Sequence, residues 1–140
     1  MNNTTGTSKD DGWSVGVRHT VAAPLDEVWS FLLGKGLSIW LGNARMTFEK
    51  GAKYKTDDDI FGHIISVSDK SRVRMTWQPG EWHHDSTLHV TVKKSESGGT
   101  VIGFQQERLA DRDERKIMLT HWKEVLERLD EALSKAARRP

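Results

Sequence analysis

The sequence predicts an α+β fold in which a curved antiparallel β-sheet wraps around one long C-terminal α-helix. Three observations lead to this prediction. An alternating strand at residues 15–21 runs directly into a short helix, alternating segments with short connections follow between residues 45 and 107, and a helical period then extends to about residue 136. Because short connections favour antiparallel pairing and an apolar helix face must be buried, the long helix is expected to cover one face of the sheet.

The first strand is expected over residues 15–21. Val15, Val17 and Val21 lie on one side of an extended chain, and polar side chains alternate with them, which is the pattern of a half-buried strand. His19 falls on the apolar side. The strand is therefore expected to present one face to the core and to form an edge of the sheet.

The strand leads through Ala-Ala-Pro into a helix expected over residues 24–32. Pro24 suits the first helical position, where its missing N–H costs nothing, and acidic side chains follow in the first turn, where the helix dipole favours them. An apolar stripe that includes Trp29 is expected to face the core, and Gly34 is placed to adopt the left-handed conformation that often ends a helix. A second short helical turn is expected over residues 37–41.

The middle of the chain alternates between apolar and polar residues, with Gly51 and the Pro-Gly pair at 79–80 as turn signals. Before the second turn, Val73, Met75 and Trp77 share one parity and are expected to point inward. The expected strands are residues 45–49, a short strand around Tyr54, and residues 61–67, 72–77, 87–93 and 100–107.

A long amphipathic helix is expected from just after Leu109 to about Ala136. Asp111 and Glu114 are spaced as in a capping box, although Ser or Thr more often occupies the first position. Apolar residues recur every three or four positions, so one side of this helix is expected to cover the sheet. The stripe consists of Met118, Trp122, Val125, Leu126, Leu129 and Leu133.

The composition suits one small domain. It is expected over residues 13–137, after a disordered polar leader at 1–12 and before a frayed tail at 138–140. The formal net charge of +1 provides no overall field for nucleic acid, and no segment approaches the roughly 20 apolar residues of a membrane span. The absence of cysteine excludes disulfides and thiolate chemistry and fits a reducing cytoplasm. The sequence leaves the oligomeric state open, with a monomer favoured.

Several short motifs occur in a characteristic order between residues 15 and 133. They are Val21-Ala22-Ala23-Pro24 with Val28-Trp29, Trp40, Phe61-Gly62-His63-Ile64-Ile65, Val73-Arg74-Met75-Thr76-Trp77, Ser86-Thr87-Leu88-His89-Val90, Gly99-Thr100-Val101-Ile102, Trp122 and Arg128-Leu129. This order resembles the START-like or SRPBCC superfamily, whose Bet v 1-like fold is the helix-grip fold. The most similar branch is named after the activator of the heat-shock protein 90 ATPase. One departure is Gln106, where relatives in this branch often carry histidine.

The resemblance implies a deep cavity between the sheet and the closing helix. Different members of the superfamily use this cavity for lipids, sterols, plant hormones, polyketide intermediates or aromatic substrates, and some bacterial members of the branch are tied to stress responses. The function implied for this chain is the binding of a small hydrophobic molecule. Two alternatives stay open: a co-chaperone-type module that activates a heat-shock ATPase, and a cyclase- or hydrolase-like enzyme.

The implied cavity is expected to be lined by aromatic and apolar side chains on inward parities. Trp40, Trp77 and Trp122 are expected to converge there, because large aromatic and methionine side chains form adaptable apolar pockets. Ordinary core packing is the alternative for each of the three. The expected ligand-binding residues are Trp40, Met46, Phe48, Met75, Trp77, Val90, Phe104, Gln106, Met118 and Trp122.

Polar chemistry in the expected cavity depends on Gln106, whose amide is placed to orient a ligand carbonyl or hydroxyl or to bond to the backbone. Residues 81–85 contain clustered histidines and carboxylates, but adjacent histidines on an extended segment point to opposite sides, so a solvated loop is favoured over a metal site. His19 and His121 are placed at the cavity edge and His89 outward. Because no pair of titratable groups lies on an inward face, no catalytic residue, metal or cofactor is expected.

Overall fold

The computed structural model describes residues 7–8 and 12–138. Its elements in chain order are β1 (Thr7–Ser8), β2 (Gly12–Val21), α1 (Leu25–Leu33), α2 (Leu37–Trp40), β3 (Lys53–Lys55), β4 (Ile60–Ser68), β5 (Arg72–Pro79), β6 (Ser86–Lys94), β7 (Thr100–Leu109) and α3 (Arg112–Arg138).

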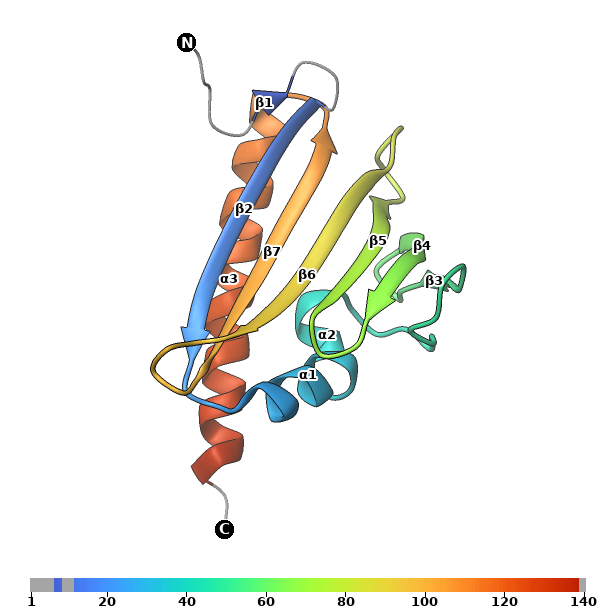
Figure 1. Cartoon of the computed structure of the whole chain (residues 1–140). Helices are drawn as coiled ribbons and strands as arrows, with labels where there is room; N and C mark the ends of the chain where they lie inside the picture. The colour runs from blue at the N-terminus through green and yellow to red at the C-terminus, as the bar shows by residue number, and fades with distance from the viewer. Residues whose placement is uncertain (1–6, 9–11, 139–140) are drawn as a thin grey trace.

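The strands of this described part form one antiparallel sheet in the order β1-β2-β7-β6-β5-β4-β3. In Figure 1 the sheet twists and curves, and α3 passes behind β2 and β7, against which it packs. The short helices α1 and α2 contact β6 and α3, respectively. The predicted α+β arrangement, a curved antiparallel sheet around a long C-terminal helix, is confirmed.

The strand register explains why the sheet has one apolar face. Val17 pairs with Phe104, Phe104 with Val90, and Val90 with Val73, so this row crosses four strands on the side that faces α3. Successive side chains of a strand point to opposite faces, so the intervening residues form a polar outer face. Trp29 of α1 is buried at the end of the same core, as predicted.

Helix α1 begins and ends differently from the prediction. Pro24 is the N-cap residue with φ −70° and ψ 156°, one position before the helix, and its carbonyl accepts the Val28 N–H at 3.0 Å. Gly34 has φ −119° and is not left-handed. Of the two glycines in this turn, Gly36 has the tighter steric requirement, because a Cβ there would lie 2.6 Å from the Phe31 ring, where the chain folds back over α1.

The strand predicted at residues 45–49 is absent, which corrects the sequence interpretation. Met46 and Phe48 are half-buried and pack against the core, while their neighbours are exposed, so the alternation itself is present. The segment pairs with no strand and connects α2 to β3. The apolar side chains of this segment are buried by packing against the core, which does not require the backbone to form hydrogen bonds with a neighbouring strand.

The N-terminus of α3 confirms the predicted contact from Asp111 to the Glu114 N–H, but the return contact of Glu114 goes to Ala110 and not to the N-cap residue. The Glu114 N–H donates to Asp111 Oδ1 at 2.8 Å, and the Glu114 carboxylate returns to accept the Ala110 N–H at 2.9 Å. The N–H groups of Ala110 and Glu114, at the start of this helix, are thereby satisfied by side chains.

The chain ends fall largely outside the described residues, and with them most of the leader predicted at 1–12 and the tail predicted at 138–140. Of the described residues there, Thr7 pairs with Trp13 and Ser8 with Gly12 in a short β-ladder, and Arg138 is the last residue of α3. Among the described helices, none is both long enough and apolar enough to cross a membrane.

Candidate functional site

Aromatic side chains gather between the sheet and α3, at the end of the fold where the β5–β6 loop meets the N-terminal half of the helix. We call this set the aromatic cluster. It consists of Trp40 of α2, Trp77 of β5, Trp82 of the β5–β6 loop, Phe104 of β7, and His121 and Trp122 of α3.

The rings of the aromatic cluster are in direct contact. Phe104 and Trp122 stack with their centroids 4.8 Å apart and their planes at 9°. Trp40 lies 6.1 Å from Phe104, and Trp77 lies 5.9 Å from Trp122. Trp82 meets Trp77 edge-on at 5.4 Å. These separations are in the range of favourable aromatic pairs, so the rings form one packed unit between the two layers.

A buried polar chain runs through the aromatic cluster. The Trp122 indole N–H donates to Gln106 Oε1 at 2.8 Å, Gln106 Nε2 donates to Ser86 Oγ at 2.9 Å, and Ser86 Oγ donates to the Trp77 carbonyl at 2.7 Å. Gln106 and Ser86 are fully buried. Because the indole can only donate, the contact fixes the orientation of the Gln106 amide, and both of its ends are already engaged.

The indole N–H of Trp77, unlike that of Trp122, has no hydrogen-bond acceptor among the described residues. The indole nitrogen is buried, and the side chain is only 3% exposed. Trp40, by contrast, donates its indole N–H to the Leu32 carbonyl at 2.8 Å. A buried donor without an acceptor costs about 1–3 kcal/mol. Among its buried indoles, the aromatic cluster therefore contains one described N–H, that of Trp77, that is available to an incoming acceptor.

His121 lies beside this free indole. Its ring centroid is 6.3 Å from that of Trp77 and 4.6 Å from that of Trp122. Burial lowers the pKa of His121, the charge of Arg128 lowers it further, and Glu124 opposes the shift. The imidazole is therefore neutral near pH 7 and provides one hydrogen-bond donor and one acceptor.

The β5–β6 loop closes this end of the fold and is attached to α3 through His84. The His84 ring stacks on Trp82 with centroids 4.9 Å apart, and His84 Nε2 lies 2.9 Å from a Glu114 carboxylate oxygen. Partial burial by itself lowers the pKa of His84. The hydrogen bond to the Asp85 carbonyl and the Glu114 carboxylate outweigh it and raise the pKa.

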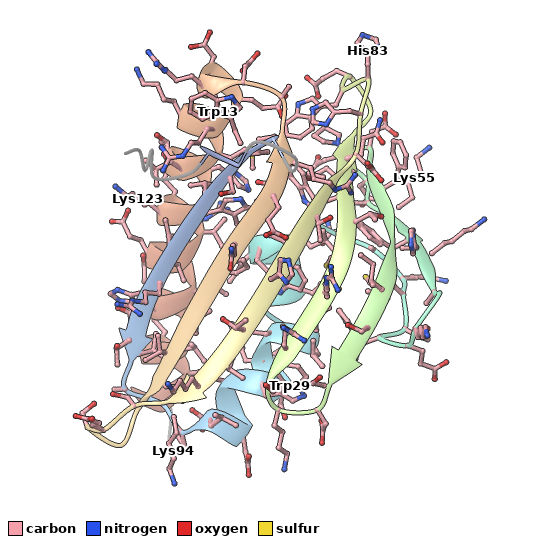
Figure 2. All side chains as sticks on the ribbon, turned by 45° about the horizontal axis from the view of Figure 1, so that its top comes forward. Trp13, Trp29, Lys55, His83, Lys94 and Lys123 are labelled. Atoms are coloured by element: carbon pink, nitrogen blue, oxygen red, sulfur yellow. The ribbon has the colours of Figure 1, made fainter. Side chains whose placement is uncertain are left out.

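Residues 81–85 do not assemble a metal site. Among the described residues, no group of three His, Asp or Glu side chains is arranged to hold an ion. His84 pairs with Glu114, Asp85 pairs with Arg108 at 2.7 Å, and His83 projects outward from the loop tip in Figure 2. His19 and His89 are also engaged: His19 lies 2.8 Å from Asp130 and is exposed, and His89 contacts Glu107 on the outer face.

The residues predicted to line a cavity fill the space between sheet and helix. Met46 and Phe48 are half-buried on the α2–β3 segment, and none of the other eight is more than 3% exposed. The structure has hollows at its surface, such as a groove of about 800 Å³ beside β3. The eight are Trp40, Met75, Trp77, Val90, Phe104, Gln106, Met118 and Trp122.

Sequence reasoning missed Trp82 and Ser86. Trp82 lies in a loop without periodicity, and its only signal is a large aromatic residue within a run of turn and charged residues. Ser86 begins β6, and nothing in its local sequence indicates that it receives the Gln106 amide.

The family model described as "Activator of Hsp90 ATPase homolog 1-like protein" matches residues 22–134. The chain belongs to this family. The match extends over the strands β3 to β7, both short helices and most of α3, so the family assignment and the fold agree.

Solved structures support the same fold. CalU16 from Micromonospora echinospora superposes with a TM-score of 0.76 at 19% identity, over 91% of this chain and 78% of its own. The Aha1 dimer from Colwellia psychrerythraea gives 0.70 at 16% identity, over 86% and 95%. PFC0360w, described as an HSP90 activator from Plasmodium falciparum, gives 0.62 at 14%, over 72% and 76%. A search of curated proteins found no match.

Proposed function

We propose that this family member binds a small, largely apolar ligand that carries a hydrogen-bond acceptor, in the aromatic cluster between the sheet and α3. The observation that carries the proposal is the buried Trp77 indole N–H, which has no acceptor among the described residues. A ligand carbonyl, ether or hydroxyl oxygen at this nitrogen would satisfy the donor, and the surrounding rings would take the apolar part of the ligand.

The neighbouring polar groups support this choice of ligand chemistry. Gln106 already accepts from Trp122 and donates to Ser86. The Trp77 indole N–H and the neutral His121 imidazole are further hydrogen-bonding groups available to a ligand. Neither of the two is charged, which favours a neutral ligand over a carboxylate or an ammonium.

Ligand access requires a ring to move, because the cluster is packed. Trp82 is the candidate, since it is half-buried and lies on a loop rather than on a strand or helix. The loop is held by the hydrogen bond from Gln78 Nε2 to the Trp82 carbonyl at 2.9 Å and by the His84–Glu114 contact. Only molecules with an open loop can bind, so the apparent affinity is expected to equal the intrinsic affinity multiplied by the fraction of molecules in which the loop is open.

The test uses intrinsic tryptophan fluorescence and thermal shift with fatty acids, sterols and neutral aromatic compounds, among them benzophenone and its hydrocarbon analogue diphenylmethane. Wild type is expected to prefer the carbonyl compound by about 2- to 12-fold, the value of one hydrogen bond. Trp77→Phe is expected to abolish this preference. Trp13→Phe, at a tryptophan on β2 that Figure 2 places apart from the loop, is the control that should retain it. Absence of binding in every class, or a preference that survives in Trp77→Phe, would refute the proposal.

A second candidate function, activation of an Hsp90-type ATPase, is favoured by the family to which the chain belongs. Its test is the steady-state ATPase rate of a purified Hsp90-type chaperone with increasing amounts of this protein, and an unchanged rate would exclude it. The lack of cysteine supports a cytoplasmic location for either function. The proposed link to a stress response depends on the family alone.

A further inference from the structure

The outer face of the sheet, which points away from α3, carries a group of exposed cations. Figure 2 looks onto this face, with α3 behind the strands. Arg18 of β2, Arg72 and Arg74 of β5, and Lys93 of β6 are all exposed and share the outer parity. We call these four residues and the surface between them the cationic face.

The register places Arg18 and Arg72 in one row across the sheet, and a shallow hollow lies within this row. Arg18 pairs with Gly103, Gly103 with Thr91, and Thr91 with Arg72, so the row runs from one arginine to the other across four strands. Adjacent strands are about 4.8 Å apart, which separates the two arginine backbones by roughly 14 Å. Because Gly103 has no side chain, a hollow of about 360 Å³ opens between the strands, with Arg18 and Lys93 at its rim.

The positive charge of this face is not compensated within the described residues. None of the four cations forms an ion pair with a described carboxylate, whereas seven other pairs of charged or histidine side chains do form such contacts. Glu107, the acidic residue in the outer rows of β7, is engaged by His89 at 2.9 Å. Like charges held close together without partners repel each other, so an anionic partner would be stabilising.

We infer that the cationic face binds an acidic segment of a protein partner, laid across the strands so that its carboxylates meet the four cations. The hollow over Gly103 accommodates one acidic side chain, and the Thr91 hydroxyl and Gln105 amide in its lining supply further hydrogen-bond donors. The formal net charge of the whole chain is only +1, so the attraction is local and suits a short segment better than a polyanion such as a nucleic acid. The site lies on the opposite side of the sheet from the aromatic cluster, so it is independent of the proposed ligand function.

The experiment measures the fluorescence anisotropy of a fluorescein-labelled peptide of alternating glutamate and serine residues as the protein is added. Two double variants are compared, Arg72→Glu with Arg74→Glu on the cationic face, and Lys116→Glu with Lys123→Glu on α3. Both pairs change the net charge by the same amount, and both α3 lysines are exposed and outside any described ion pair. In Figure 2 Lys123 projects beyond the β2 edge of the sheet.

Wild type is expected to bind the acidic peptide, with an affinity that falls as salt is added and with amide shifts at Gly103 and Thr91 in heteronuclear NMR spectra. The cationic-face variant should lose about tenfold or more in affinity and the α3 variant less than about twofold. Equal losses in the two variants, or no binding by wild type, would overturn the inference. Tighter binding of duplex DNA or of vesicles containing phosphatidylserine at the same amides would overturn it as well, in favour of that partner.

Discussion

Two substitutions of the same kind, Trp77→Phe and Trp122→Phe, separate packing from hydrogen bonding in the aromatic cluster. Both indoles are at most 3% exposed and each contacts three other aromatic rings. The change removes the same atoms at both sites, so the loss of buried area and the space left behind are similar. The difference is that only the Trp122 N–H has a partner, which is Gln106 Oε1 at 2.8 Å.

The expected magnitudes follow from that difference. Trp122→Phe leaves the Gln106 carbonyl oxygen buried without a donor, which adds about 1–3 kcal/mol to the packing cost. Trp77→Phe removes a donor that has no acceptor, so it adds no such cost. Trp122→Phe is therefore expected to be the less stable variant by about 1–3 kcal/mol, or about 4–10 °C in melting temperature for a domain of this length.

The assay is urea unfolding followed by far-UV circular dichroism, which reports the loss of backbone structure, and the variants are compared by their unfolding midpoints and m-values. Gln106→Met is the matched partner in a double-mutant cycle, and its combination with Trp122→Phe should cost about 1 kcal/mol less than the sum of the single changes, because neither group is then left alone. Equal stability of the two Trp→Phe variants, or a less stable Trp77→Phe, would show that the Trp77 indole has an acceptor and would remove the basis of the ligand proposal.

Further predictions concern pH and two sites outside the cluster. The pKa of His121 is lowered, so the contribution of this side chain to stability is complete above its ordinary pKa of 6.5 and is lost as the pH falls below that value. When the pH is lowered from about 7.5 to about 5.5, His121→Gln should therefore gain stability relative to wild type in urea unfolding. The pKa of His84 is raised, so the contribution of this side chain to stability is present below pH 6.5 and is lost as the pH rises through the folded-state pKa. His84→Gln should therefore lose stability relative to wild type over the same fall in pH. Curves of stability against pH that run parallel for His121→Gln and His84→Gln would contradict the two pKa shifts. Tyr54→Phe removes a buried hydrogen bond of 2.7 Å to a backbone carbonyl of β5 and should cost about 0.5–1.5 kcal/mol, whereas an unchanged urea midpoint would show that the bond contributes nothing. Gly62→Ala places a Cβ against the same carbonyl and should cost about 1–3 kcal/mol, while Gly16→Ala, with its nearest contact at 4.0 Å, serves as the control and should be within about 0.5 kcal/mol of wild type.

Apart from the absent strand at residues 45–49 and the short strand β1, the sequence was sufficient to predict the order of the elements and the inward face of each long strand. Val73, Met75 and Trp77 are all buried on the side predicted, because alternation over several residues determines which face of a strand is apolar. The contact from Asp111 to the Glu114 N–H was also predictable, because it depends on two residues three positions apart.

Features that depend on tertiary contacts were not predictable in this way. Alternation at residues 45–49 indicates which side chains are buried, but not whether the backbone finds a pairing partner, and here it does not. Gln106 was correctly placed on the inward face, yet its partners Ser86 and Trp122 are 20 and 16 residues away, and only the assembled layers bring them together. The free indole of Trp77 has no local signature for the same reason.

The buried polar chain from Trp122 through Gln106 and Ser86 to the Trp77 carbonyl has a consequence for how α3 is positioned along the sheet. Apolar contacts are nearly non-directional, so a helix that slides by one turn, about 5.4 Å, can exchange one set of such contacts for another at small cost. Hydrogen bonds cannot be exchanged in this way, and the same slip would leave the indole N–H and the Gln106 oxygen unpaired. The bond from Trp122 to Gln106 therefore sets the position of α3 along the sheet, and the two bonds within the sheet hold the Gln106 amide in the orientation that accepts it.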